Sequence, residues 1–479
     1  MNRIVGLETE YGCLCDDPAG PAAAVGRVRN WVFDQGKFGL TDLHQRDWDE
    51  PAGNGGFLFN GGRCYVDMGH LELCTPECVD LRDLILYDRV GDHLISTATA
   101  DLGMSGKTTF VRNNIDYHSG ATFGCHENYL LRRAAPLREE NVQSLLTFLT
   151  LRVLYTGAGR VRATPSAESR PESLAPWQNS DFQLSQRADF INNDLFEWVQ
   201  FNRAIINTRD EPLADARKYR RLHLLHGDTS VLPATLAAKI GTTSLVLDLL
   251  EIDQLPKLAL TDAVMTFRNL SHAPNGPWLV PLTGGRCRPA LEILRLYHDL
   301  AAAEFRDRDE ETNQVLALWK RALEGLESDP ESLVGTVDWI TKQWLFRQFV
   351  AAENLSWDDP WLQAQDLEYH SVDPDRNLSL SVAQTPPEWS HSDDELTAAQ
   401  DTPPANTRAA ARSSIMRALE NQDLRYFVDW EVIDAEGVNS LSLLDPFDPK
   451  PPEIGTWMRR MRAAAAEGRP EGDPLDSNK

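Results

Sequence analysis

The stretch that decides the fold is Asn60-Gly-Gly-Arg-Cys-Tyr-Val-Asp67-Met-Gly-His-Leu-Glu72. It has the pattern of a β-strand that runs into a tight bend crowded with carboxylates. Tyr65 and Asp67 are two residues apart, so in a strand both side chains point to the same face. Glu72 follows just beyond the bend. The function of this acidic face therefore depends on which residues the neighbouring strands contribute to it.

Two further stretches repeat the two-residue spacing: Gly6-Leu-Glu8-Thr-Glu10-Tyr-Gly12 and Gly124-Cys-His126-Glu127-Asn128-Tyr129. A pair of acids on one face of a strand suits a protein core only when cations compensate them, and hard divalent ions with oxygen ligands do so. The alternatives are a solvated strand face for Glu8 and Glu10, and a satisfied core or surface histidine for His126. We expect the three strands to share one face of a sheet and to hold metal ions and a nucleotide there.

Composition describes a folded protein with an uneven acidic charge. The 479 residues are 42% hydrophobic and 25% charged, which is ordinary for a globular chain of one large domain with an appended piece, or of two to three domains. The formal charge of −25 argues against a general nucleic-acid binder, which needs a basic footprint. Residues 1–250 carry 32 acids and 25 bases, and residues 251–479 carry 40 and 22. A basic groove for an anionic ligand is therefore expected in the first half.

The sequence predicts a cytoplasmic protein with no membrane partner. It has no run of about 18 apolar residues, and its first residues lead into a strand pattern without the layout of a signal peptide. Its seven cysteines are odd in number and scattered, as expected of reduced thiols. A zinc site at Cys74 and Cys78 would lack a second ligand pair at the usual spacing.

Local patterns predict the main elements of a first domain over residues 1–405. Polar, glycine-rich residues 34–56 predict a long surface loop of the kind that often forms a lid. The segment from Asp210 to Arg221 opens with acids and a proline and becomes basic along its length, which favours a helix aligned with its dipole. Residues 162–180, rich in Ser, Pro and Glu, predict a loop. Helical spacing predicts helices over 81–102, 139–156, 231–250, 289–305, 309–326 and 330–349.

A small C-terminal domain is expected over residues 406–479. Residues 384–407 are rich in proline and threonine and predict a flexible crossing that precedes it. Beyond them we expect a helix at 409–420, a strand at 426–433, a last helix near 454–466 and a disordered tail.

Arginines form a second group of candidate residues in the first half of the chain. Arginine binds carboxylates and phosphates with two parallel hydrogen bonds and stabilises a phosphoryl group in transfer. A basic solvated helix face is the favoured interpretation of Arg217 and Lys218. No Walker loop, kinase loop or dinucleotide-binding fingerprint is present, nor is there a nucleophile motif of Ser, Cys or His. The candidates are Arg187, Arg209, Arg217, Arg220 and Arg221, which precede His223.

Taken together, the motifs resemble the family of the prokaryotic ubiquitin-like protein (Pup) ligase and its sister depupylase/deamidase. The resemblance covers most of residues 1–250 and continues weakly to Trp430. It implies an α+β, glutamine-synthetase-like fold, in which an antiparallel sheet forms a cradle backed by helices, with a small C-terminal domain alongside. The motifs are Glu-Thr-Glu-Tyr-Gly, Asn-Gly-x-Arg-x-Tyr-x-Asp, Gly-Cys-His-Glu-Asn-Tyr, Phe-Gln-Leu-Ser-Gln-Arg, Ile-Ile-Asn-Thr-Arg-Asp-Glu-Pro and Ala-Asp-Ala-x-x-Tyr-Arg-Arg-Leu-His.

The resemblance also implies roles for individual residues. Asp67 corresponds to the catalytic aspartate, and Arg209 to an arginine of the phosphate region. The metal positions correspond to Glu8, Tyr65 and Glu72, with Glu10 close by. The positions that bind the nucleotide correspond to His126, Asn128, Arg187, His223, Arg408 and Trp430.

The implied reaction is an ATP- and Mg²⁺-dependent ligation. ATP converts the C-terminal glutamate of a Pup-like modifier to a γ-glutamyl phosphate, and a lysine of a target protein attacks it while Asp67 accepts the proton. Gly-Cys-His-Glu-Asn-Tyr favours the ligase over the depupylase/deamidase, which hydrolyses the same bond or a C-terminal glutamine. A non-catalytic protein that only binds the modifier is a third alternative, which the intact Glu8, Asp67, Glu72 and Arg209 argue against. Leu71 and Leu213 depart from the family pattern, so a divergent modifier fits the sequence as well.

Overall fold

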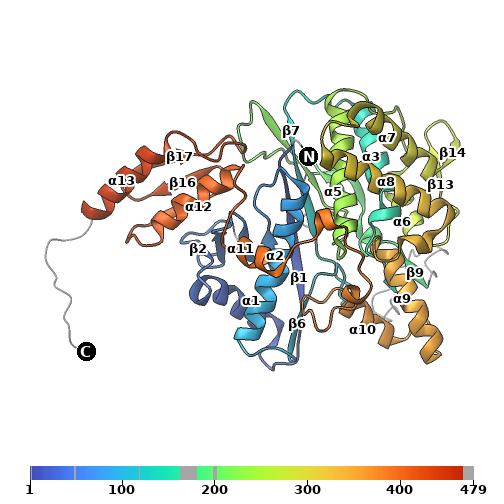
Figure 1. Cartoon of the computed structure of the whole chain (residues 1–479), viewed down its shortest axis with the longest axis horizontal. Helices are drawn as coiled ribbons and strands as arrows, with labels where there is room; N and C mark the ends of the chain where they lie inside the picture. The colour runs from blue at the N-terminus through green and yellow to red at the C-terminus, as the bar shows by residue number, and fades with distance from the viewer. Residues whose placement is uncertain (2, 48–49, 118, 162–180, 198–201, 468–479) are drawn as a thin grey trace.

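A mixed sheet of ten strands lies at the centre of the protein (Figure 1). The computed structural model describes residues 1–479 except 2, 48–49, 118, 162–180, 198–201 and 468–479, so the loop expected at 162–180 and the expected disordered tail from residue 468 lie outside the described residues. Neighbouring strands are antiparallel, apart from the parallel pair β10–β11. In order across the sheet the strands are β10 (Asn193–Phe196), β11 (Ala204–Asn207), β12 (Tyr219–Leu224), β7 (Cys125–Arg132), β1 (Val5–Cys15), β5 (His70–Cys74), β4 (Arg63–Asp67), β3 (Gly55–Leu58) and β2 (Gly39–Thr41), with β6 (Thr108–Val111) paired to the far end of β1.

The register of the strands aligns the residues that the sequence singled out. Glu8 lies opposite His126 on one side and Cys74 on the other. Glu10 lies opposite Glu72, which in turn lies opposite Tyr65. Because residues opposite each other in a sheet point to the same face, these side chains converge as expected.

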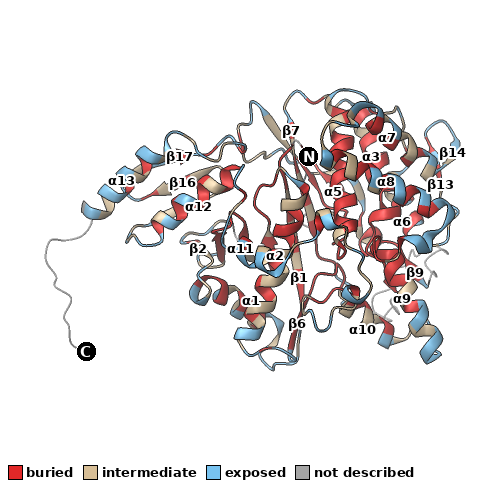
Figure 2. Ribbon diagram, in the orientation of Figure 1, coloured by how far each residue is buried: buried red, intermediate tan, exposed pale blue. Residues whose placement is uncertain are grey.

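The two faces of the sheet differ in burial, as the alternating pattern along β1 and β7 shows. One face carries Val5, Leu7 and Tyr11 and is sealed by helices, with which it forms one continuous hydrophobic core. On β1 and β7 the other face carries polar residues that are only partly buried (Figure 2). Glu72 and His223, on the neighbouring strands β5 and β12, are buried. The helices are α1 (Gly20–Asn30), α2 (Leu81–Asp101), α3 (Glu139–Leu151), α4 (Val153–Thr156), α5 (Pro233–Glu251), α6 (Ala263–Ser271), α7 (Ala290–Phe305), α8 (Glu310–Ser328), α9 (Asp338–Glu353), α10 (Pro360–Tyr369) and α11 (Asp393–Ala399).

A small unit at the left of Figure 1 completes the chain. It consists of α12 (Arg408–Leu419), a three-stranded sheet and α13 (Ile454–Glu467). The strand expected at 426–433 is two strands, β15 (Tyr426–Val428) and β16 (Val432–Ala435), and β17 (Val438–Ser442) follows. Its core includes Leu40, Phe57 and Phe59 from the β2–β3 edge of the large sheet. The division at residue 405 stays a prediction.

Three local predictions were wrong. Residues 210–221 form no helix, because 210–218 is a loop with turns and Tyr219–Leu224 is strand β12. Residues 384–407 are not an unstructured crossing, since they contain α11 and a 3₁₀ turn whose Trp389 is buried. Residues 34–56 are not simply a surface loop, since they supply the edge strand β2 and the buried Leu40.

The α+β architecture expected from the sequence, an antiparallel cradle with helices behind it and a small C-terminal unit alongside, is confirmed. Within the described ranges, no helix combines the length and the apolar character needed to cross a membrane.

Candidate active site

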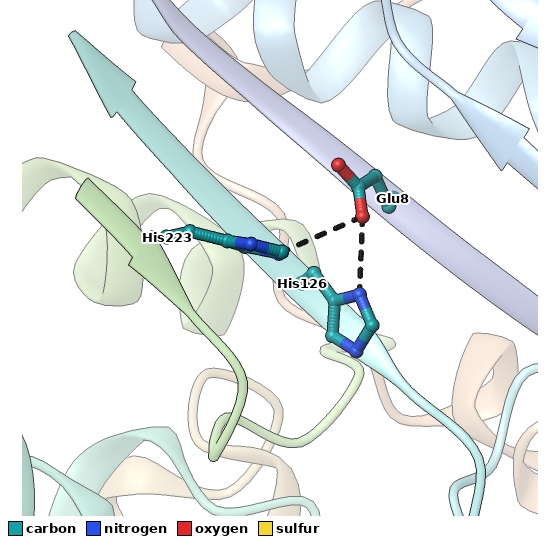
Figure 3. Close-up of side chains that lie close together, drawn as sticks. All are labelled: Glu8, His126 and His223. Atoms are coloured by element: carbon teal, nitrogen blue, oxygen red, sulfur yellow. Dashed lines mark hydrogen bonds and ion pairs between the residues drawn. The ribbon is translucent and has the colours of Figure 1, made fainter. Parts of the chain in front are cut away.

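The first cluster on the polar face joins three strands, β1, β7 and β12. His126 Nδ1 lies 3.0 Å from Glu8 Oε2, and Asn128 Nδ2 donates a hydrogen bond of 2.8 Å to Glu8 Oε1. His223 Nε2 lies 3.8 Å from the same Oε2 atom (Figure 3). Ligand atoms of Glu8, His126 and His223 fall within 4.8 Å of one another, so they are close enough to share one ion.

The second cluster lies one strand further along the same face and is wholly acidic. Carboxylate oxygens of Glu10, Asp67 and Glu72 lie within 4.8 Å of one another. Tyr65 donates a hydrogen bond of 2.6 Å from its hydroxyl to Glu72 Oε1. In the described part of the chain, no ion pair joins Glu10 or Glu72 to a lysine or arginine. Oxygen ligands grouped in this way are of the kind that hard divalent cations prefer.

The electrostatics of the two clusters differ. Burial and the charges of Glu8 and Glu10 raise the pKa of Glu72 well above its ordinary value, and the Tyr65 hydrogen bond only partly offsets this. Burial also opposes the charge of Glu8, but the hydrogen bond with His126 and the charges of His223, His126 and Arg221 together outweigh it and hold the pKa of Glu8 below its ordinary value. Burial lowers the pKa of His223 to about 3, so its ring is neutral and able to offer a lone pair.

A pocket of about 150 Å³ adjoins the first cluster. Glu8, Tyr65, Cys74, Asn128 and Arg221 line it from the sheet. The C-terminal unit closes it with Arg408, Trp430 and Pro446. The pocket therefore lies between the two units, beside the candidate metal ligands.

A buried ion cluster fixes the C-terminal wall of the pocket. Glu77, just beyond β5, accepts hydrogen bonds from Arg408 at 2.7 Å and from Arg412 at 2.6 Å. Arg412 also donates to the carbonyl oxygens of Gly61 and Trp430. Its guanidinium lies 4.9 Å from the centre of the Trp430 ring, a cation–π distance. Trp430 is thereby held in place at the pocket.

The structure brings neither Arg187 nor Arg209 into the lining of the pocket. Arg209 is 57% exposed, pairs with Glu211 at 2.7 Å and lies two residues beyond the end of β11. Arg187 is buried, and its guanidinium donates to the carbonyl oxygens of Leu225 and Phe123. Two further candidates also lie outside it, since Arg217 is exposed and pairs with Asp215, and Arg220 donates to the carbonyl oxygen of Arg133. The remaining predicted residues lie in the two clusters or in the lining of the pocket.

The chain matches the family model described as Pup-ligase protein over residues 3–434. The chain belongs to the Pup-ligase family. The resemblance in the motifs is thus confirmed.

Curated relatives in this family match over nearly their whole length. The Pup--protein ligase of Mycolicibacterium smegmatis is 35% identical over 449 residues, which is 90% of this chain and 92% of the relative. That of Corynebacterium kroppenstedtii is 33% identical over 470 residues, 93% and 94% respectively.

Two solved structures of the Pup ligase PafA share the fold. One is a complex with the prokaryotic ubiquitin-like protein Pup, with a TM-score of 0.81 and 31% identity over 97% of this chain and 94% of that one. The other contains ADP, with a TM-score of 0.76 and 33% identity over 86% and 90%. The cradle fold expected from the motifs is that of Pup ligases.

Sequence reasoning missed several residues of the site. Arg63 lies on the same face as Tyr65, with its guanidinium 4.1 Å from the ring centre, and Cys74 follows Glu72 in β5. The spacing of two that joins Tyr65 to Asp67 also joins Arg63 to Tyr65 and Glu72 to Cys74, so it would have found both. Asn207, 3.4 Å from the ring of His223, and Glu77 had no such local signal. Cys74 and Cys78 join no cluster of metal ligands among the described residues.

Proposed function

We propose that this protein is an ATP-dependent ligase that joins the C-terminal glutamate of a Pup-like modifier to lysines of target proteins by an isopeptide bond. The observation that carries the proposal is the pair of clusters on one face of the sheet, beside a pocket that two units close. Support comes from the two matched PafA structures, one a complex with Pup and the other a complex with ADP.

The donor set on the polar face fits hard divalent cations. Glu10, Asp67 and Glu72 offer oxygens within 4.8 Å of one another, and in the described residues neither glutamate pairs with a basic side chain. We propose Glu8, Glu10, Tyr65 and Glu72 as the residues that would hold Mg²⁺. When bound, Mg²⁺ neutralises phosphate charge and polarises the phosphoryl oxygens. In this scheme Asp67 is adjacent to the ion rather than one of its ligands.

The pocket provides the nucleotide site in this proposal. Trp430 offers an aromatic wall for a base, and Arg408 offers a cation at the same wall. Asn128 and the neutral His223 lie at the end nearer Glu8, and His126 joins them there, so these three would contact the phosphates and orient the metal ligands. Arg209, whose charge acts on the ring of His223, and the buried Arg187 complete the proposed set, the latter by holding the backbone before β7.

The reaction needs two steps on this face. A carboxylate is a poor electrophile, so the glutamate side chain of the modifier first attacks the γ-phosphorus of ATP and leaves ADP and a γ-glutamyl phosphate. The lysine amine of the target then attacks the acyl carbon, and phosphate departs. Asp67 accepts the proton that the amine loses, because it lies among the groups that surround the activated carbon. We expect this to occur in the cytoplasm, where ATP is available and the seven free cysteines stay reduced.

The test uses purified full-length protein with ATP, Mg²⁺, a Pup-like modifier ending in glutamate and a lysine-bearing protein. The expected result is ADP together with a conjugate whose isopeptide bond is located by mass spectrometry. Omission of ATP and a modifier ending in glutamine are the controls. Hydrolysis of a preformed conjugate without any ligation would instead assign the depupylase/deamidase activity. Binding of the modifier without ADP formation would show a non-catalytic protein.

A further inference from the structure

The bend between β4 and β5 combines two unusual features at one residue, Met68. Asp67 lies opposite His70, so Met68 and Gly69 alone form the turn. Both have positive φ, 44° and 91°. Two-residue hairpins of this kind favour Asn, Asp or Gly at the first position, because other side chains crowd their own backbone there. A methionine at this position costs conformational free energy.

Nothing within the described chain offsets that cost. Met68 is 72% exposed, the highest value among the exposed large hydrophobic residues. An exposed thioether gains little from burial, and a glycine would form the turn more easily. Non-glycine residues held in the left-handed region cluster at active sites and ligand contacts.

The hairpin nevertheless holds Met68 in a defined place. The ring of His70 stacks on Phe123 with centroids 4.8 Å apart and planes 25° apart. Phe123 is itself buried, packs over Gly12 of β1 and accepts a hydrogen bond from Arg187. The tip is therefore anchored to the sheet through His70, the residue directly opposite Asp67 in the hairpin.

The position of Asp67 next to Met68 indicates which molecule Met68 contacts. Asp67 precedes it directly, with Cα atoms about 3.8 Å apart, and in the proposed reaction Asp67 accepts the proton of the target lysine. A lysine whose amine reaches this carboxylate brings its four-carbon stem past the tip of the hairpin. Lysine stems pack along apolar surfaces while the amine stays polar, and methionine is flexible enough to follow an incoming chain.

We propose that Met68 is a specificity-determining contact for the acceptor, packing its thioether against the methylene stem of the target lysine. The inference rests on the proposed ligase function and adds to it the residue that selects a long alkyl amine over a small nucleophile.

The test compares Met68→Gly and Met68→Leu with the unmodified chain, using two nucleophiles. One is a lysine-bearing peptide, and the other is hydroxylamine, which traps a γ-glutamyl phosphate as a hydroxamate and has no stem. We expect Met68→Gly to raise KM for the peptide about fourfold to tenfold, the equivalent of one or two buried methylenes. Met68→Leu conserves volume and should stay within about twofold.

Three control readouts separate this contact from a structural role. Hydroxamate formation and the KM values for ATP and for the modifier should be unchanged in Met68→Gly, and its melting temperature should rise because glycine relieves the positive φ. An unchanged KM for the peptide overturns the proposal. A raised KM for the modifier also overturns it and assigns the tip to the modifier instead. Absence of ATP-dependent hydroxamate from the unmodified chain would show that the proposed function itself has failed.

Discussion

The two faces of the sheet carry two kinds of acidic environment. On β7, Glu127 points into the helix-packed core, where Arg152 donates hydrogen bonds of 2.6 and 2.9 Å to its two oxygens and Tyr129 donates another of 2.7 Å. The charges of Arg152 and Lys239 and the hydrogen bonds from Arg152 outweigh burial and lower the pKa of Glu127 to about 2. On the other face, Glu72 meets Glu10 and Asp67 instead of arginine, and its pKa is raised.

The contrast separates acids that belong to the fold from acids that belong to the function. Glu127 is as buried as any residue in the chain, yet its charge is fully neutralised within the protein. On the polar face, Glu10 and Glu72 have no lysine or arginine partner within the described residues, as is typical of acids that serve a binding or catalytic site. Substitutions on the polar face should therefore reduce activity, and substitutions on the helix-packed face should reduce stability.

The largest effect is expected from Asp67→Asn. Asparagine keeps the size of the side chain but cannot accept the lysine proton, so the rate of ligation should fall by roughly 10²–10⁴-fold. ADP formation in the first step and ATP binding should be nearly unchanged, since Asp67 is proposed to act in the second step. Rapid-quench measurement of both steps, with the exposed Asp101→Asn as the control, tests this. Loss of ATP binding would place Asp67 among the metal ligands instead.

On the helix-packed face, Glu127→Gln should lower stability rather than activity per folded molecule. It leaves the buried Arg152 with no carboxylate, which typically costs about 3–5 kcal/mol of unfolding free energy. Urea denaturation compares it with Glu304→Gln, an exposed acid on α7 whose change should stay within about 0.5 kcal/mol. A folded, stable but inactive Glu127→Gln would contradict the division between the faces.

The sequence predicts the parts of this contrast that depend on residues close together along the chain, and it does not predict the parts that depend on distant residues. Spacing of two is local, so it placed Glu8 with Glu10, and His126 with Asn128, on shared faces. The same spacing put Glu127 on the opposite face, but nothing local indicated its partner Arg152, 25 residues away. Register between strands, which sets Glu10 against Glu72, is a long-range property that only the folded sheet reveals.

The wrong local predictions also come from long-range packing. In residues 210–221 the change from acidic to basic charge favours a helix, but the alternation Arg221-Leu222-His223-Leu224 is a strand pattern. Pairing with β7 and β11 stabilises that strand. In residues 384–407 the prolines concealed Trp389, whose burial against the main core orders the segment. Tertiary packing overrode local composition in both cases.

The buried ion cluster of Glu77, Arg408 and Arg412 holds the C-terminal unit in place. Its loss should lower stability, as loss of the Glu127–Arg152 pair does, and the size of this effect should depend on pH. Burial alone would raise the pKa of Glu77, but Arg412 and Arg408 lower it from 4.5 to about 2. Its contribution to stability is therefore fully present above about pH 4.5 and is lost as the pH falls towards 2, a total of about 3 kcal/mol. Glu77→Gln should lack that contribution at neutral pH and converge with the unmodified chain in acid.

Denaturation of both proteins at several pH values measures this convergence. Because Glu77 also holds the wall that carries Arg408 and Trp430, the variant should bind ATP more weakly while its rate at saturating ATP changes little. A stability difference that does not depend on pH would show that packing, rather than charge, holds the unit in place.

The smallest effect, and the sharpest test of the contrast, is expected from Glu72→Gln in the absence of metal. Glu72 lies directly opposite Glu10, and like charges opposed across a sheet destabilise it by roughly 0.2–1 kcal/mol. Removing one charge should therefore raise the stability of the metal-free protein, the reverse of Glu127→Gln. Mg²⁺ should stabilise the unmodified chain, by about 2.7 kcal/mol at a hundred times its Kd, and this gain should disappear in the variant. Thermal denaturation with and without Mg²⁺ measures both effects. A metal-free Glu72→Gln that is less stable than the unmodified chain would mean that Glu72 supports the fold, so that the two faces do not divide as the strand register indicates.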